Sequence, residues 1–164
     1  MSHQLGLILL AALAALGGLT FLHYLRRRSR PALPYRKTDH LLTPAERSFY
    51  EVLRRIIGDD LRLFVKVRLA DLVWLPHDIE NRQAHVNRVA AKHIDFVLCD
   101  PRTFAPVLAV ELDDSSHEAR HRQQRDALVN AVLRTVGVPL LRVPVKRSYV
   151  PSEVAEDIRS AMRG

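Results

Sequence analysis

The sequence contains a single cysteine, Cys99, among its 164 residues. One thiol cannot close an intrachain disulfide, and it also excludes zinc sites that depend on several cysteine ligands. The shortage of cysteine fits a reducing compartment. With 48% apolar residues, a chain of this length predicts one domain of ordinary size and one additional segment.

Acidic residues are absent from the first 37 positions, which hold six bases at positions 26, 27, 28, 30, 36 and 37. The rest of the chain holds the other 19 bases and all 18 acids, so most of the net charge of +7 comes from this N-terminal stretch. The rest of the chain is nearly neutral. Its overall charge therefore gives no argument for binding DNA or RNA.

Charges are also absent between Leu5 and Leu22, an 18-residue apolar run that extends to residue 25 if two further residues lie at an interface. An α-helix needs about 20 apolar residues to span a bilayer. The arginines follow the run, whereas a secretory signal peptide carries its positive charges before it. We predict a transmembrane anchor over residues 1–25, with the N-terminus outside and the domain in the cytoplasm, because positive flanks stay inside. A buried Ala/Leu-rich helix and a misassigned start codon are the alternative explanations.

A basic juxtamembrane linker, rich in polar residues and proline, is predicted over residues 26–42, and the domain over residues 43–164. Thr43 and Glu46 have the spacing of a capping box, which predicts a helix that runs to Ile57 and ends at Gly58. Glu46 has two interpretations, a capping carboxylate and a supporting active-site acid.

Alternating apolar residues predict strands over residues 63–69, 94–99 and 107–113. Strict alternation places Leu63, Val65, Val67 and Leu69 together, and it places Ile94, Phe96 and Leu98 together. Later segments predict a helix over 117–136, a strand over 139–145 and a helix over 151–162. The order α-β-β-β-α-β-α predicts an α/β domain, a small mixed sheet flanked by helices on both faces. Residues 79–91 fit a helix or an ordered loop, and Trp74 fits packing better than base stacking.

Three acids converge at the second and third strands. If residues 100–103 turn the chain and Cys99 pairs with Val107, then Val97 meets Ala109, and Asp95 lies opposite Glu111. Asp113 shares the face of Glu111. Like charges opposite each other destabilise a sheet by up to about 1 kcal/mol. A hard divalent cation bound through oxygens is the simplest explanation for them.

The motif residues carry a resemblance to a known superfamily. Asp95 on one strand and Glu111-Leu112-Asp113 on the next resemble the PD-(D/E)XK superfamily, which implies a restriction-endonuclease-like core. Residues 92–117 followed by 122–144 are similar to the bacterial domain-of-unknown-function family 2726 and to very-short-patch-repair endonucleases. The similarity covers about residues 41–145. A bacterial source would make the membrane the inner membrane.

The resemblance implies a catalytic role for Asp95, Glu111, Asp113 and His117. Asp95 and Glu111 would hold a divalent cation, expected to be magnesium, that polarises a phosphate of DNA or RNA and activates water. Asp113 stands where the superfamily usually has lysine, so a substitute is expected from His117, Arg122 or Arg125. Histidine can act as a base near neutral pH.

Structural alternatives stay open for each of these residues. Asp95 and Glu111 could form an acid cluster neutralised by Arg142 or Lys92, and Asp126 could form a salt bridge with Arg142 instead of supporting catalysis. His117 could simply lie at the start of the helix predicted over 117–136, or His117 and His121 could chelate a transition metal. Arg122 and Arg125 could bind phosphate or simply be solvated. The two functional hypotheses are a membrane-tethered nuclease-like phosphodiesterase and a catalytically inactive binding or scaffold module.

Overall fold

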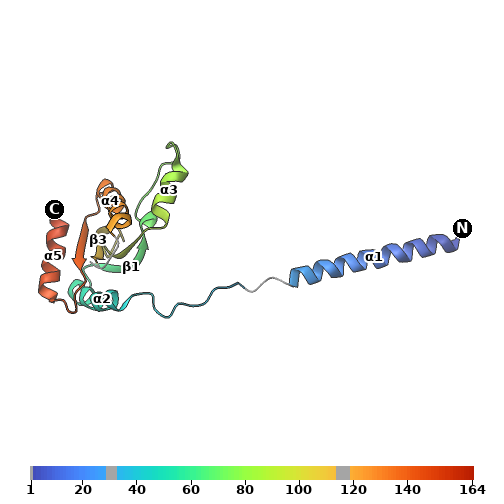
Figure 1. The fold of residues 1–164 in the computed structure, drawn as a ribbon, viewed down its shortest axis with the longest axis horizontal. Helices are drawn as coiled ribbons and strands as arrows, with labels where there is room; N and C mark the ends of the chain where they lie inside the picture. The colour runs from blue at the N-terminus through green and yellow to red at the C-terminus, as the bar shows by residue number, and fades with distance from the viewer. Residues whose placement is uncertain (1, 29–32, 114–118) are drawn as a thin grey trace. The chain divides into compact units, whose positions relative to one another are not determined.

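The computed structural model describes residues 2–28, 33–113 and 119–164. The chain divides into two units, residues 1–39 and residues 40–164 (Figure 1). The first unit contains helix α1 (Ser2–Arg28), and the second contains the mixed α/β domain. Each unit is described separately below.

Helix α1 contains a 19-residue apolar segment, Gly6–Tyr24, with a mean hydropathy of 2.0. Its leucines are exposed, with Leu7 at 71% and Leu10 at 70%. In length and composition this helix can cross a membrane, although an N-terminal signal sequence meets the same criteria. No residue of the segment is buried within its own unit.

The described part of the domain has four strands, four α-helices and a short 3-10 helix. In chain order they are α2 (Pro44–Ile57), β1 (Arg62–Arg68), η1 (Leu69–Asp71), α3 (Arg82–Ala90), β2 (His93–Cys99), β3 (Pro106–Asp113), α4 (Ala119–Thr135), β4 (Leu140–Pro144) and α5 (Pro151–Arg163). The predicted order is confirmed, and α3 shows that the undecided segment is helical. The sheet order is β1-β2-β3-β4, with β3 and β4 parallel and the other neighbours antiparallel. Helix α4 is the crossover that the parallel pair requires.

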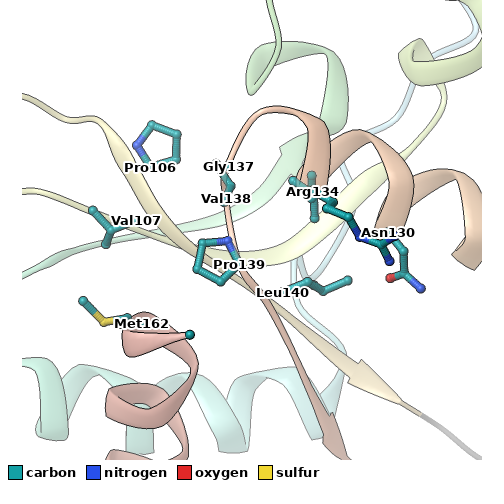
Figure 2. Close-up of a pocket in the computed structure, with 11 residues that line it drawn as sticks. Pro106, Val107, Asn130, Arg134, Gly137, Val138, Pro139, Leu140 and Met162 are labelled. Carbon is teal, nitrogen blue, oxygen red and sulfur yellow. The ribbon is translucent and has the colours of Figure 1, made fainter.

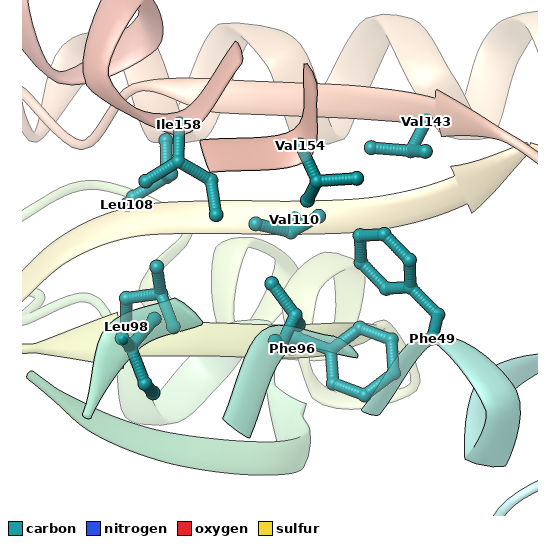
Figure 3. Packing of buried hydrophobic residues seen from close by; sticks show 10 residues of the cluster. Phe49, Phe96, Leu98, Leu108, Val110, Val143, Val154 and Ile158 are labelled. Atoms are coloured by element: carbon teal, nitrogen blue, oxygen red, sulfur yellow. The ribbon is translucent and has the colours of Figure 1, made fainter. Parts of the chain in front are cut away.

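Helices cover both faces of the sheet, as predicted. On one face α2 and α5 pack against β2, β3 and β4 in a first apolar cluster (Figure 3). Phe49 at its centre is fully buried, with ring centroids 5.6 Å from Phe96 and 4.8 Å from Tyr149. On the other face, Val129 and Leu133 of α4 belong to a second cluster. Truncating a buried phenylalanine such as Phe49 costs about 3–5 kcal/mol.

The capping box at the start of α2 is present. The backbone N–H of Thr43 donates to Glu46 Oε2 at 2.9 Å, and the backbone N–H of Glu46 donates to Thr43 Oγ1 at 3.3 Å. Gly58 ends the helix with φ 52°, a left-handed conformation that glycine adopts without strain. The helix therefore starts and stops where the sequence predicts.

The β2–β3 hairpin has one register difference from the prediction. Val97 pairs with Ala109 as predicted, but Cys99 pairs with Pro106 instead of Val107, because the register shifts between Leu98 and Cys99. Asp100 holds the turn, accepting backbone bonds from Arg102 at 2.9 Å and Thr103 at 2.8 Å. These bonds, that from Thr103 first, lower the pKa of Asp100.

Strict alternation fails at the centres of β1 and β2. Val65 packs against the first cluster, whereas Val67 and Leu69 belong with the second. Ile94 likewise belongs to the second cluster, although Phe96 belongs to the first. The change in β1 occurs at Lys66, whose φ of 53° is left-handed. A residue in that conformation interrupts the regular pleat, so the neighbours on its two sides no longer share a face.

Trp74 is 75% exposed, so the prediction that it packs in the core is wrong. Its neighbours Leu72 and Val73 pack against the second cluster instead. Leu72 and Val73 therefore make the apolar contacts of this segment with the second cluster.

Candidate functional site

Four charged residues lie at one level across the sheet, one on each strand. Glu111 pairs directly with Arg142. The neighbouring pairs Phe96–Val110 and Val65–Phe96 place Asp95 opposite Glu111 and Lys66 opposite Asp95. From β1 to β4 the charged row is therefore Lys66, Asp95, Glu111, Arg142, with the two acids on the central strands.

Lys66 joins the row to helix α2. Its Nζ lies 2.5 Å from Glu46 Oε1 and 3.1 Å from Asp95 Oδ1. The other oxygen of Asp95, Oδ2, accepts a hydrogen bond from the backbone N–H of Leu112 at 3.1 Å. The ammonium thus neutralises acids from a helix and from the adjacent strand.

Burial and ion pairing act in opposite directions on Glu46 and Lys66. Burial favours the neutral carboxyl, but hydrogen bonds from Lys66 and Thr43 outweigh it and lower the pKa of Glu46. Burial likewise favours the neutral amine, but hydrogen bonds to Glu46 and Asp95 raise the pKa of Lys66. Both groups are therefore charged at neutral pH, although Glu46 is only 8% exposed.

Arg142 forms the other end of the row. Its Nη2 lies 3.1 Å from Glu111 Oε2 and 3.6 Å from Asp126 Oδ1, and it donates to Asn130 Oδ1 at 3.4 Å. Glu111 is 6% exposed. The predicted salt bridge between Asp126 and Arg142 is present, and Arg142 also neutralises Glu111.

Each cation of the charged row contacts one acid on a strand and one on a helix. Lys66 contacts Asp95 and Glu46, and Arg142 contacts Glu111 and Asp126, so four acids border the two bases. The structural interpretation of the acids is thus supported for Arg142, whereas the cation beside Asp95 is Lys66 and not the expected Lys92.

Residues 38–162 match the family model described as Protein of unknown function (DUF2726). The chain belongs to this family. The match includes all four strands, so the whole charged row lies within the DUF2726 domain. No curated protein matches the chain, and no solved structure matches it.

Asp95 and Glu111 are the carboxylates that the resemblance assigns to a divalent cation. Among the described residues, no three or more His, Cys, Asp or Glu side chains gather into a metal-binding group. Magnesium is commonly held by one or two carboxylates and several waters, so a magnesium site on Asp95 and Glu111 stays a prediction.

The other predicted site residues have different positions. Asp113 is exposed at the end of β3, where its carbonyl accepts a bond from Val145 N–H at 3.0 Å. His117 lies outside the described residues, as do the side chains of His121, Arg122 and Arg125. Their predicted roles stay predictions.

Lys66 is the functional candidate that the sequence did not reveal. The sequence has no lysine close to Asp113, and the expected substitutes are His117, Arg122 and Arg125, which all follow Asp113 in the sequence. Lys66 lies 29 positions before Asp95 and reaches it only through strand pairing. Its one local signal was a charged side chain in the middle of an apolar strand.

A hollow of about 720 Å³ is separate from the row. Proline and aliphatic residues line it, with Pro139 and Leu140 from β4 and its approach and Met162 from α5 (Figure 2). It contains none of the four acids. Asn130, which lines it, also bonds Arg142, but the hollow offers no group that could perform hydrolysis.

Proposed function

We propose that the DUF2726 domain is a restriction-endonuclease-like, divalent-metal-dependent phosphodiesterase that acts on nucleic acid. One observation carries this proposal: two acids on adjacent central strands, Asp95 and Glu111, have a cation on each side. Phosphodiester hydrolysis needs a carboxylate pair for a metal and positive charge for the phosphate. The row supplies both on rigid strands.

Each residue of the row would have a separate role in hydrolysis. Asp95 and Glu111 would hold magnesium, which when bound polarises the phosphate and makes water more acidic. Lys66 keeps its proton near neutral pH, so it would donate to a phosphate oxygen and would not accept a proton from water. Arg142 would hold Glu111 in place. The predicted base is His117, and Asp113 is predicted to assist.

A second candidate is a catalytically inactive binding or scaffold module. The observation in its favour is that Asp95 and Glu111 already have cationic partners at 3.1 Å. An acid cluster that is neutralised in this way can be structural. The position of Asp95 and Glu111 on adjacent central strands, which matches the resemblance, favours the enzyme over this alternative.

We also propose that α1 anchors the domain in the bacterial inner membrane, with the N-terminus outside. Support comes from the length of the apolar segment and from the arginines that follow it. Deleting residues 2–25 should move the protein from the membrane fraction to the soluble fraction. Protease added to spheroplasts should leave the domain intact, and cleavage of the domain would reverse the proposed orientation.

Cleavage assays with the full chain in detergent test the enzymatic proposal. DNA and RNA would be incubated with magnesium or manganese and with wild type, Asp95→Ala, Glu111→Ala or the control Asp157→Ala, which alters an exposed acid on α5. We expect cleavage by wild type and the control, and a loss of at least about 100-fold in the two row variants. Cleavage that survives both row substitutions would remove the row from the active site. A wild type that raises its melting temperature with metal but cleaves nothing would favour the binding module.

A further inference from the structure

Glu46 uses its two carboxylate oxygens for different partners. Oε2 accepts the backbone N–H of Thr43 at 2.9 Å, and Oε1 contacts Lys66 Nζ at 2.5 Å. The first contact fixes the start of α2, and the second fixes a side chain on β1. One carboxylate therefore connects the helix terminus to the charged row.

Glu46 is more deeply buried, and has more contacts, than a helix cap requires. Cap residues normally lie near the surface, and the capping bond needs only one oxygen. Glu46 is instead one of only two buried charged residues in the described chain, and the other is Glu111, in the row itself. Burying a charge is unfavourable without a partner, so its burial is accounted for by Lys66.

Lys66 in turn needs a fixed partner on the α2 side. Its side chain carries several rotatable bonds and is 29% exposed, and its backbone is left-handed at φ 53°. Asp95 alone could be approached by a lysine from several directions, because an ammonium is a point charge without a preferred orientation. The contact with Glu46 selects one of these directions.

We infer that Glu46 is a positioning residue whose carboxylate, in the first turn of α2, holds Lys66 beside Asp95. This inference rests on the proposed function, because the effect of positioning appears as a rate of phosphodiester hydrolysis. Glu46 does not touch the reacting atoms in this scheme. Its carboxylate keeps the ammonium where the phosphate would bind, and the helix keeps the carboxylate in place.

Matched variants separate positioning from capping. Glu46→Gln removes the charge that holds Lys66 but retains an oxygen for Thr43 N–H. Thr43→Ala removes the hydroxyl cap but leaves both contacts of the Glu46 carboxylate, and Glu51→Gln changes an exposed acid on the same helix. Each would be made in the full chain in detergent.

Cleavage kinetics should show coupling between Glu46 and Lys66. We expect Glu46→Gln to lower kcat about 10- to 100-fold with little change in KM, as expected when one group positions a catalytic cation. Thr43→Ala and Glu51→Gln should keep kcat within about twofold. The double variant Glu46→Gln with Lys66→Met should be no slower than Lys66→Met alone, because the two residues act through one contact. Effects that multiply in the double variant, or an equal loss of kcat in Thr43→Ala, would overturn the inference.

A second measurement decides the question if wild type cleaves nothing. Lysine ammonium groups held in an ion pair exchange protons with water slowly enough to give a nitrogen–proton correlation signal in NMR. We expect the Lys66 signal, assigned by its loss in Lys66→Met, in wild type and Thr43→Ala but not in Glu46→Gln. Its persistence in Glu46→Gln would overturn the positioning role. Absent cleavage together with a lost signal would instead reject only the proposed function.

Discussion

The two halves of the charged row contain the same types of group in mirror order. In the first half, Glu46 from a helix and Asp95 from a central strand share a lysine on edge strand β1. In the second half, Asp126 from a helix and Glu111 from a central strand share Arg142 on edge strand β4. Each half therefore places one cation between two acids.

The halves differ in how the backbone produces this arrangement. Arg142 lies on a regular parallel pair, where Glu111 is its direct partner. Lys66 lies in a left-handed conformation that interrupts β1. A guanidinium also binds with a fixed fork, whereas an ammonium depends on its surroundings for direction. The contact of Arg142 with Glu111 thus follows from the regular pairing of β3 with β4. The contacts of Lys66 depend instead on a left-handed residue that interrupts β1.

The largest expected effect is in the second half. Arg142→Met removes the cation beside Glu111, which is 6% exposed, and should lower the free energy of unfolding by about 3 kcal/mol, because a buried carboxylate then loses an ion-pair partner. Denaturant unfolding of the full chain in detergent, followed by circular dichroism, measures this loss.

Arg159→Met is the control for that measurement. Arg159 pairs with Glu156 on the surface, where both side chains are about 60% exposed, so its loss should stay within about 0.5 kcal/mol. Equal losses in the two variants would mean that the Arg142 pair stabilises the fold no more than a surface pair does.

A smaller and pH-dependent effect is expected in the first half. Glu46→Gln should lower the free energy of unfolding by about 1–2 kcal/mol at pH 7, since Lys66 loses a charged partner. The folded pKa of Glu46 is lowered, so its contribution is present above the unfolded value and is lost as the pH falls through the folded value. The folded pKa of Lys66 is raised, so its contribution is lost only as the pH rises through the folded value.

Unfolding measured between about pH 3 and pH 9 tests this pH dependence. The difference between wild type and Glu46→Gln should be constant from about pH 5 to pH 9 and shrink toward pH 3. Glu51→Gln, whose side chain is 47% exposed, should show a difference near zero throughout. A Glu46→Gln difference that persists unchanged at pH 3 would assign the effect to packing or capping instead of the ion pair.

The contrast between the halves also explains what the sequence could predict. Element order, the capping box of α2, the hairpin turn at Asp100 and the pairing of Val97 with Ala109 follow from local patterns, and all are confirmed. The Arg142–Asp126 contact was one of two interpretations that the sequence left open, and the structure contains it. Regular backbone makes such reasoning reliable.

Local patterns fail where a single residue departs from regular geometry. The alternation of Val65 and Val67 predicts that both lie on one face of the sheet. The left-handed conformation of Lys66 places them against different clusters instead. Nothing in the order of residues around Lys66 marks that conformation, which glycine and asparagine adopt far more readily. The partner of Asp95 was missed because it depends on this one dihedral angle and on pairing across 29 positions.

The smallest expected effect tests that dihedral angle directly. In a regular strand, glycine is less stable than alanine by about 0.5–1 kcal/mol, because it loses more conformational freedom on folding. At φ 53° the order should reverse, since a Cβ costs about 1–2 kcal/mol there and glycine has none. Lys66→Gly should therefore unfold at higher denaturant than Lys66→Ala, although both lose the ion pairs. Phe64, two residues earlier on β1 and without a positive φ, supplies the matched pair Phe64→Gly and Phe64→Ala, for which alanine should be the more stable. If alanine is the more stable at both positions, β1 is regular at Lys66, and the difference between the two halves of the row would lie only in their side chains.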